Sequence, residues 1–126
     1  MKIIIVGCGR LGSGLANELS SEGNDVAVIT ADKCRLAALE SDFTGQSFLG
    51  VEFDRDILQT AGIDKADSLI ACTQSDDTNA LVARIAKEYY QVPKVIARLY
   101  DSSKVDLYNA LGIQVLATTQ WGVERA

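Results

Sequence analysis

Residues 2–16, KIIIVGCGRLGSGLA, decide how the rest of the chain is expected to fold. The apolar run at residues 3–6 stops at a glycine, and Leu11, Leu15 and Leu19 then recur at the spacing of one helix face. The stretch therefore predicts a strand, a tight turn and a helix, in that order.

The predicted turn contains the pattern Gly7-x-Gly9-x-x-Gly12. In dinucleotide-binding folds the first glycine permits the sharp turn, the second lets a pyrophosphate approach the backbone, and the third lets the helix pack closely on the strand. Free N–H groups at the helix start would hold the phosphates, and Arg10 can add a charged donor. We interpret the turn as a nucleotide site; the alternatives are a purely structural glycine turn and, for Arg10, a solvated loop arginine.

The composition limits the classes of function. The chain has 126 residues, enough for one domain but too few for a nucleotide domain plus a separate catalytic domain. Its formal net charge of -5 argues against nucleic acid or an anionic membrane as the main partner, because both select basic faces. No stretch resembles a signal peptide or approaches the roughly 20 apolar residues that span a bilayer, so we expect a soluble, cytoplasmic protein.

Cysteine and histidine usage is also informative. Cys8, Cys34 and Cys72 form no CxxC pair, and histidine is absent. The sequence therefore suggests neither a disulfide framework nor a metal site.

The rest of the chain alternates between strand and helix patterns. Apolar runs predict further strands at residues 25–30, 46–51, 66–72, 92–99 and 113–116. Helical spacing predicts helices at residues 33–40, 55–61, 78–90 and 102–111, with Leu81, Ile85 and Tyr89 stacked at four-residue spacing along the third of these. We predict the α/β class, as a Rossmann-like doubly wound parallel sheet of about six strands with helices on both faces.

In such a sheet the ligand crevice lies at the carboxyl ends of the strands, at the point where the strand order reverses. The sequence places there residues 7–12, residues 30–32, residues 71–73 and Arg98. The alternative for Arg98 is an internal salt bridge to Asp76 or Asp101.

The end of the second strand departs from the usual NAD pattern. An acid at this place would accept hydrogen bonds from the ribose hydroxyls, but Thr30 stands there. Three interpretations stay open: Asp32 reaches the ribose, Thr30 contacts it with its hydroxyl alone, or Lys33 and Arg35 favour an extra phosphate on the ribose. Asp32 can also cap the helix predicted at residues 33–40.

Four segments carry a resemblance to a known family. They are GCGRLGSGLA at 7–16, GIDKADSLIACTQSDDTNALVARIAKE at 62–88, VPKVIARLYD at 92–101 and LYNALGIQVLATTQ at 107–120. The most specific features are the pair Ala66-Asp67, the pattern Thr73-x-x-Asp76-x-x-Asn79 and the strand end Ile96-Ala97-Arg98. Over essentially its whole length the chain resembles the N-terminal regulatory domain of potassium channels and transporters, called the TrkA-N, KTN or RCK N-terminal domain.

The resemblance implies a nucleotide-sensing cytoplasmic regulatory subunit and not an enzyme. Members bind an adenine nucleotide, NAD(H), ATP, ADP or AMP, in the Rossmann crevice. They pair as homodimers, often assemble into rings, and pass nucleotide-dependent changes to a membrane potassium transporter or channel subunit. We therefore expect this chain to be peripheral to the inner face of the cell membrane through such a partner, and not inserted in the membrane itself.

The resemblance also implies roles for single residues. Phosphates would be held by Gly7, Gly9, Arg10, Leu11 and Gly12; the adenosine ribose would be surrounded by Thr30, Ala31, Asp32 and Lys33; the cleft would be lined further by Cys72, Thr73 and Arg98. Residues 1–117 would form the nucleotide-binding domain, and residues 118–126 would begin a crossover helix toward a C-terminal lobe that this chain lacks. Where the family commonly has Gly-Asp after the third strand, this chain has Gly50 and Val51, with Glu52 and Asp54 nearby, so a carboxylate facing the adenine is lost or shifted.

Other functions remain as alternatives. A small NAD(P)-dependent oxidoreductase or redox-sensor subunit could use Cys72 beside a nicotinamide, with Tyr100 or Tyr108 as a proton donor. The missing histidine and the missing Tyr-x-x-x-Lys pairing disfavour it, and a buried structural cysteine is the simpler interpretation of Cys72. A nucleotide sensor of another system is a further alternative.

Three aromatic residues lie late in the chain: Tyr89, Tyr90 and Trp121. They suit either the interface of a homodimer or the core of the chain itself.

Overall fold

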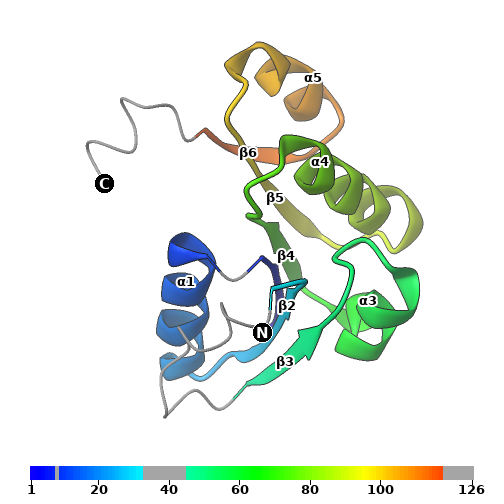
Figure 1. The fold of residues 1–126 in the computed structure, drawn as a ribbon. Helices are drawn as coiled ribbons and strands as arrows, with labels where there is room; N and C mark the ends of the chain where they lie inside the picture. The colour runs from blue at the N-terminus through cyan, green and yellow to red at the C-terminus, as the bar shows by residue number, and fades with distance from the viewer. Residues whose placement is uncertain (8, 33–44, 118–126) are drawn as a thin grey trace.

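The computed structural model describes residues 1–7, 9–32 and 45–117. Six strands form one parallel sheet in the order β3-β2-β1-β4-β5-β6 (Figure 1). They are β1 Lys2–Val6, β2 Asp25–Thr30, β3 Gln46–Leu49, β4 Ser68–Ala71, β5 Lys94–Leu99 and β6 Gln114–Ala117. The chain moves outward from β1 to β3 and then returns to start β4 beside β1, so the doubly wound sheet is confirmed.

The helices are α1 Arg10–Ser21, α3 Arg55–Ala61, α4 Asp76–Arg84 and α5 Val105–Ala110, with the short 3-10 turns η1 Ile63–Lys65 and η3 Ser102–Lys104. A π-helical turn, η2 Ile85–Tyr89, continues α4. The helix predicted at residues 33–40 and the element expected at residues 118–126 lie outside the described residues. None of the described helices is long and apolar enough to cross a membrane.

Helices cover both faces of the sheet, with α1 on one side and α3, α4 and α5 on the other (Figure 1). Ile3 of β1 belongs to the apolar cluster that contains Ala16 of α1. Its neighbour Ile4 belongs to the opposite cluster, with Leu58 of α3 and Val82 of α4. Because successive side chains of a strand point to opposite faces, a strand covered on both sides is apolar along its covered part, as residues 3–6 of β1 and 26–29 of β2 are.

Leu81, Ile85 and Tyr89, which the four-residue spacing stacks along residues 78–90, do not form one buried face. Asn79 and Val82 of α4 are fully buried, whereas Leu81 is 44% exposed and Tyr89 is 64% exposed. The helix also begins earlier than predicted, at Asp76, and the side chain of Ser75 caps it by accepting from the N–H of Thr78 at 3.2 Å.

Two features explain this shift. Asn79 is polar, so a hydrophobic pattern does not place it inside, yet its hydrogen bonds hold it there. The helix then widens in η2, where the N–H of Tyr90 donates to the carbonyl of Ile85 at 3.4 Å, five residues back instead of four. The wider turn changes the phase of the apolar positions, so Ile85 is buried while Tyr89 turns outward.

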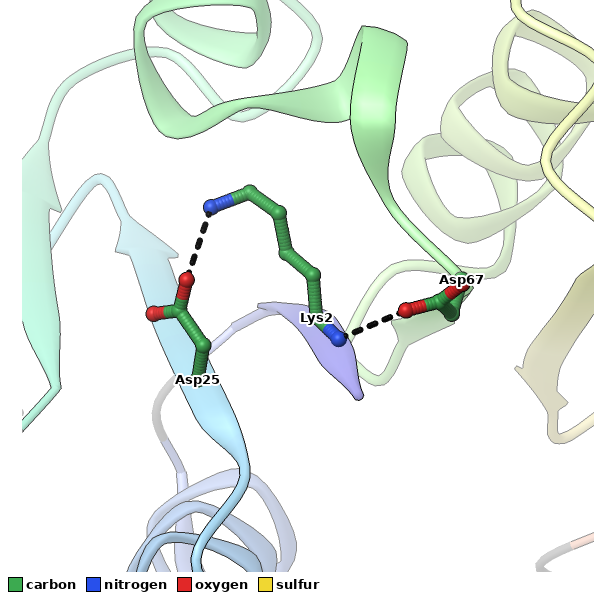
Figure 2. A network of polar contacts seen from close by, with 3 residues as sticks. All are labelled: Lys2, Asp25 and Asp67. Carbon is green, nitrogen blue, oxygen red and sulfur yellow. Dashed lines mark hydrogen bonds and ion pairs between the residues drawn. The ribbon is translucent and has the colours of Figure 1, made fainter.

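Three residues join the strands β2, β1 and β4 at their amino ends (Figure 2). The backbone N–H of Lys2 donates to the Asp67 carboxylate at 2.8 Å, and the N–H of Asp67 donates back to the Lys2 carbonyl at 2.8 Å. The Lys2 ammonium reaches the other way, to Asp25 at 3.3 Å. The family-specific Asp67 thus joins the starts of β1 and β4, at the opposite end of the sheet from the predicted crevice.

We expect Asp67→Ala to lower the free energy of unfolding by about 1 kcal/mol, because it removes one charge-assisted hydrogen bond at a solvent-exposed edge. Urea denaturation measures the change. Asp64→Ala, an exposed acid of η1 for which no side-chain hydrogen bond is described, is the matched control and should change stability by less than about 0.5 kcal/mol. Equal losses in the two variants would contradict a specific role for Asp67.

Candidate functional site

The turn between β1 and α1 requires glycine at its first and last motif positions. Gly7 has φ of +103°, and a Cβ there would lie 2.9 Å from the backbone nitrogen of Thr73. A Cβ on Gly12 would overlap the Gly7 carbonyl oxygen and lie 3.3 Å from the Cys72 sulfur. The two glycines therefore let the start of α1 pack directly against the end of β4, as their places in the motif predict.

The amino end of α1 has no acidic group of its own. Gly9 is its N-cap and has no side chain to accept from the first-turn N–H groups, and that turn contains no acidic residue. In contrast, Asp54 caps α3 by accepting from the N–H of Asp56 at 2.9 Å, and Ser75 caps α4. The start of α1 thus keeps N–H groups and the positive end of a helix dipole directed at the turn, which suits an anion.

A cleft of about 540 Å³ opens beside this turn, at the carboxyl ends of β1, β2, β4 and β5. It lies where β1 and β4 are neighbours, which is the point at which the strand order reverses. Its volume is in the range of small-molecule sites. Its lining residues are Gly7, Gly9, Leu11, Thr30, Ala31, Asp32, Glu52, Cys72, Thr73, Gln74, Ser75, Thr78 and Arg98.

Most of the predicted site residues meet in this cleft. Those that line it are Gly7, Gly9, Leu11, Thr30, Ala31, Asp32, Cys72, Thr73 and Arg98. Gly12 lies beneath the turn, and Arg10 is the first residue of α1, described by its backbone alone. Lys33 lies outside the described residues, as does the helix that Asp32 was predicted to cap.

The β2 end of the cleft contains a carboxylate that the sequence left unplaced. Thr30 is 2% exposed, and its hydroxyl oxygen accepts from the N–H of Asp32 at 3.2 Å. Glu52, two residues after the Gly50-Val51 pair, accepts from the N–H of Ala31 at 3.4 Å and lines the cleft. The loop after β3 thus brings a carboxylate, that of Glu52, to the lining of the cleft.

Cys72 is 2% exposed, and its sulfur lies 3.8 Å from the carbonyl oxygen of Gly7. It belongs to the apolar cluster on the α1 side of the sheet. Tyr108 is buried in the opposite cluster and does not line the cleft. These positions suit packing better than proton or thiol chemistry.

Asn79 ties the ends of β4 and β5 together beside the cleft. Its amide oxygen accepts from the N–H of Thr73 at 2.8 Å and from the Thr73 hydroxyl at 2.7 Å. Its amide nitrogen donates to the carbonyl of Thr73 at 3.0 Å and to that of Arg98 at 2.9 Å. Both atoms of the side-chain amide are thus used, and they fix the backbone of two cleft-lining residues.

Asp76 completes this connection between α4 and the end of β5. One carboxylate oxygen accepts from the N–H of Tyr100 at 2.8 Å, and the other from the N–H of Asp101 at 2.9 Å. The Arg98 guanidinium lies over the Tyr100 ring, 4.6 Å from its centroid.

The loop that follows contains a second local contact. The carboxylate of Asp101 accepts from the Ser103 hydroxyl at 2.6 Å and from the Ser103 N–H at 3.0 Å, and these bonds lower the pKa of Asp101.

The pattern Thr73-x-x-Asp76-x-x-Asn79 therefore has a structural explanation: its three side chains join two strand ends and position the cleft wall. Sequence reasoning missed the lining residues Glu52, Gln74, Ser75 and Thr78 as site candidates. Gln74, Ser75 and Thr78 lie between Thr73 and Asn79. The family-specific pattern could therefore have indicated that this whole segment borders the site.

The chain is similar to known proteins. A family profile described as the TrkA-N domain matches residues 3–119. The Trk system potassium uptake protein TrkA of Streptomyces coelicolor is 41% identical over 125 residues, which cover 99% of this chain and 56% of that protein. The chain thus spans little more than half the length of this curated relative.

Two solved structures share the fold. The TrkA-N domain of the inner membrane protein ybaL from Escherichia coli matches with a TM-score of 0.83 and 23% identity, over 98% of this chain and 91% of that chain. The Shewanella denitrificans Kef CTD in its AMP-bound form matches with a TM-score of 0.78 and 25% identity, over 94% of this chain and 72% of that chain.

Gly12→Ala should lower the free energy of unfolding by about 2 kcal/mol or more, because the added methyl group overlaps backbone that cannot move without opening the turn. Gly14→Ala on the same helix is the control, since among the described residues no atom outside the adjacent helix backbone lies within 4 Å of its added Cβ. It should stabilise the protein by up to about 1 kcal/mol through helix propensity. Chemical denaturation compares the two, and a tolerated Gly12→Ala would refute the close approach of α1 to β4.

Asn79→Asp should destabilise the protein at neutral pH by about 3 kcal/mol. The substitution keeps the shape of the side chain but replaces two N–H donors with a carboxylate that faces the carbonyls of Thr73 and Arg98. Thermal and urea denaturation measure the loss. The same substitution at exposed Asn109 of α5 is the control and should cost less than about 1 kcal/mol.

Proposed function

The chain belongs to the TrkA-N domain family, and we propose that it is a nucleotide-sensing regulatory domain of a potassium uptake system. The observation that carries the proposal is the cleft at the switch point, into which the uncapped start of α1 opens. The curated relative from Streptomyces coelicolor, named as a Trk potassium uptake protein, supplies the physiological context of the proposal.

The proposed ligand is an adenine nucleotide: NAD or NADH, ATP, ADP or AMP. The AMP-bound Kef CTD supports this class, because it is a structure of similar fold that holds such a ligand. In this chain the backbone at Gly9 and Leu11 would face the phosphates, while Asp32 and Glu52 would face the ribose. Arg98 would respond to phosphate number from the β5 side of the cleft.

The proposed mechanism is a shift between two arrangements of the assembled protein. A ligand shifts such an equilibrium only by its different affinity for the two states. We propose that copies of this chain pair as homodimers, or as rings of such pairs, on the cytoplasmic face of a membrane potassium transporter or channel subunit. Exposed apolar side chains of α4, η2 and α5, namely Leu81, Tyr89 and Leu107, are surface that pairing would cover.

In this proposal residues 1–117 form the nucleotide-binding domain and residues 118–126 begin the connection to a further lobe. The proposal assigns the chain no catalytic step. The chain has no histidine, the thiol of Cys72 is buried, and Tyr108 lies in the core away from the cleft. These observations favour a sensor over the oxidoreductase alternative.

Calorimetric titration with ATP, ADP, AMP, NAD, NADH and NADPH tests the proposal, with Gly9→Asp as the diagnostic variant. The backbone of Gly9, with φ of −80° and ψ of −160°, accepts any residue, and aspartate is a favourable N-cap, so the variant should fold. Its carboxylate would occupy the phosphate position. We expect at least one nucleotide to bind the unmodified chain and its affinity to fall about 100-fold or more in the variant.

Gly14→Asp is the matched control, because it adds the same charge to an exposed position of α1, where no described atom outside the adjacent helix backbone lies within 4 Å of the added Cβ. It should bind nucleotide as the unmodified chain does. If none of the six nucleotides binds the unmodified chain, or if the two variants lose affinity equally, the proposed site is refuted.

A further inference from the structure

The β2 end of the cleft has Thr30 in the place of the acid that reads ribose in NAD-binding folds. Thr30 is 2% exposed, and its hydroxyl oxygen accepts from the N–H of Asp32, two residues ahead in the same loop. The threonine thus shapes the loop that carries Ala31 and Asp32 into the cleft lining.

A carboxylate from the neighbouring strand reaches the same place. β2 and β3 are parallel neighbours, and Thr30 pairs with Leu49 at their carboxyl ends. The N–H of Gly50 then donates to the carbonyl of Thr30 at 2.9 Å, so the loop after β3 starts directly beside the end of β2. The register of the two strands, and not their sequence separation, brings Glu52 to Ala31.

Glu52 is held there by one oxygen. It is half-buried, and its Oε2 accepts from the N–H of Ala31 at 3.4 Å. Its other oxygen, Oε1, has no hydrogen-bond partner among the described residues. Glu52 and Asp32 therefore bring two carboxylates to the lining of the cleft at the end of β2.

We infer that Glu52, together with Asp32, makes the cleft select adenine nucleotides whose ribose carries free 2′- and 3′-hydroxyls and reject those with a 2′-phosphate. The inference rests on the proposed function, since it concerns the ligand of the same cleft. Ribose hydroxyls donate hydrogen bonds, and a carboxylate accepts them. A 2′-phosphate brings negative charge next to two carboxylates and offers no equivalent donor, so its binding is opposed. The inference extends the first of the three interpretations that the sequence left open, in which Asp32 reaches the ribose. It adds a second carboxylate, that of Glu52 from the loop after β3.

Two pairs of probes test this selectivity by calorimetry. NADPH differs from NADH only by its 2′-phosphate. ADP and adenosine 2′,5′-bisphosphate each carry two phosphates, but ADP has both at the 5′ position, whereas the bisphosphate has one of them on the 2′ oxygen. We expect NADH and ADP to bind about tenfold or more tightly than their partners. In Glu52→Gln each ratio should fall by about threefold or more, because one charge is removed while the amide oxygen can still accept from Ala31.

Asp64→Asn is the matched control: it removes the same charge from η1, at the amino edge of the sheet, and should leave both ratios unchanged. Equal binding within each pair, a preference for the 2′-phosphate, or ratios that Glu52→Gln does not change would overturn the inference while leaving the proposed nucleotide site standing. A preference for the 2′-phosphate would favour Lys33 and Arg35 as the ribose-reading residues. If none of the four probes binds, this inference fails; if ATP, AMP and NAD do not bind either, the proposed function fails with it.

Discussion

The contact between the glycine turn and the end of β4 is the constraint on which the cleft depends. Gly7 leaves room for the backbone of Cys72 and Thr73, and Gly12 leaves room for the Gly7 carbonyl. A side chain at either position would push α1 away from the sheet. Because α1 starts with N–H groups that no side chain caps, the same close packing that stabilises the fold also brings an anion-binding helix end to the switch point.

The opposite wall of the cleft is fixed by polar contacts instead of close packing. Asn79 makes four hydrogen bonds from a fully buried position and joins Thr73 to Arg98. Asp76 binds the backbone of Tyr100 and Asp101 just beyond β5. Thr73 is thus held between the glycine turn on one side and α4 on the other, and in the function proposed here a ligand that moved the turn would act on α4 through this residue. A regulatory domain needs a connection of this kind between its ligand and the surface that meets a partner.

The sequence predicted the sheet well because central strands that are buried on both faces are mostly apolar, and because the glycine pattern lies directly between such a strand and a helical pattern. The inner face of α4 could not be predicted, since buried Asn79 is invisible to a hydrophobic pattern and the π-helical turn changes the helical phase. Glu52 was noted but left unplaced for a different reason: its position beside Ala31 depends on the pairing of β2 with β3, which no local pattern encodes. Asp67, which the resemblance marks as specific, is explained by strand pairing at the far edge of the sheet (Figure 2).

The central claim is that an adenine nucleotide occupies the cleft between the glycine turn and Thr73. The most direct test is a backbone amide NMR titration of this chain with ATP, AMP and NADH. We expect the amides of Gly7, Gly9, Leu11 and Thr73 to shift with at least one nucleotide, while those of Gly62 and Gly112, at the opposite edge of the sheet, stay in place. Shifts confined to other parts of the chain, or none at all with the three nucleotides, would contradict the claim.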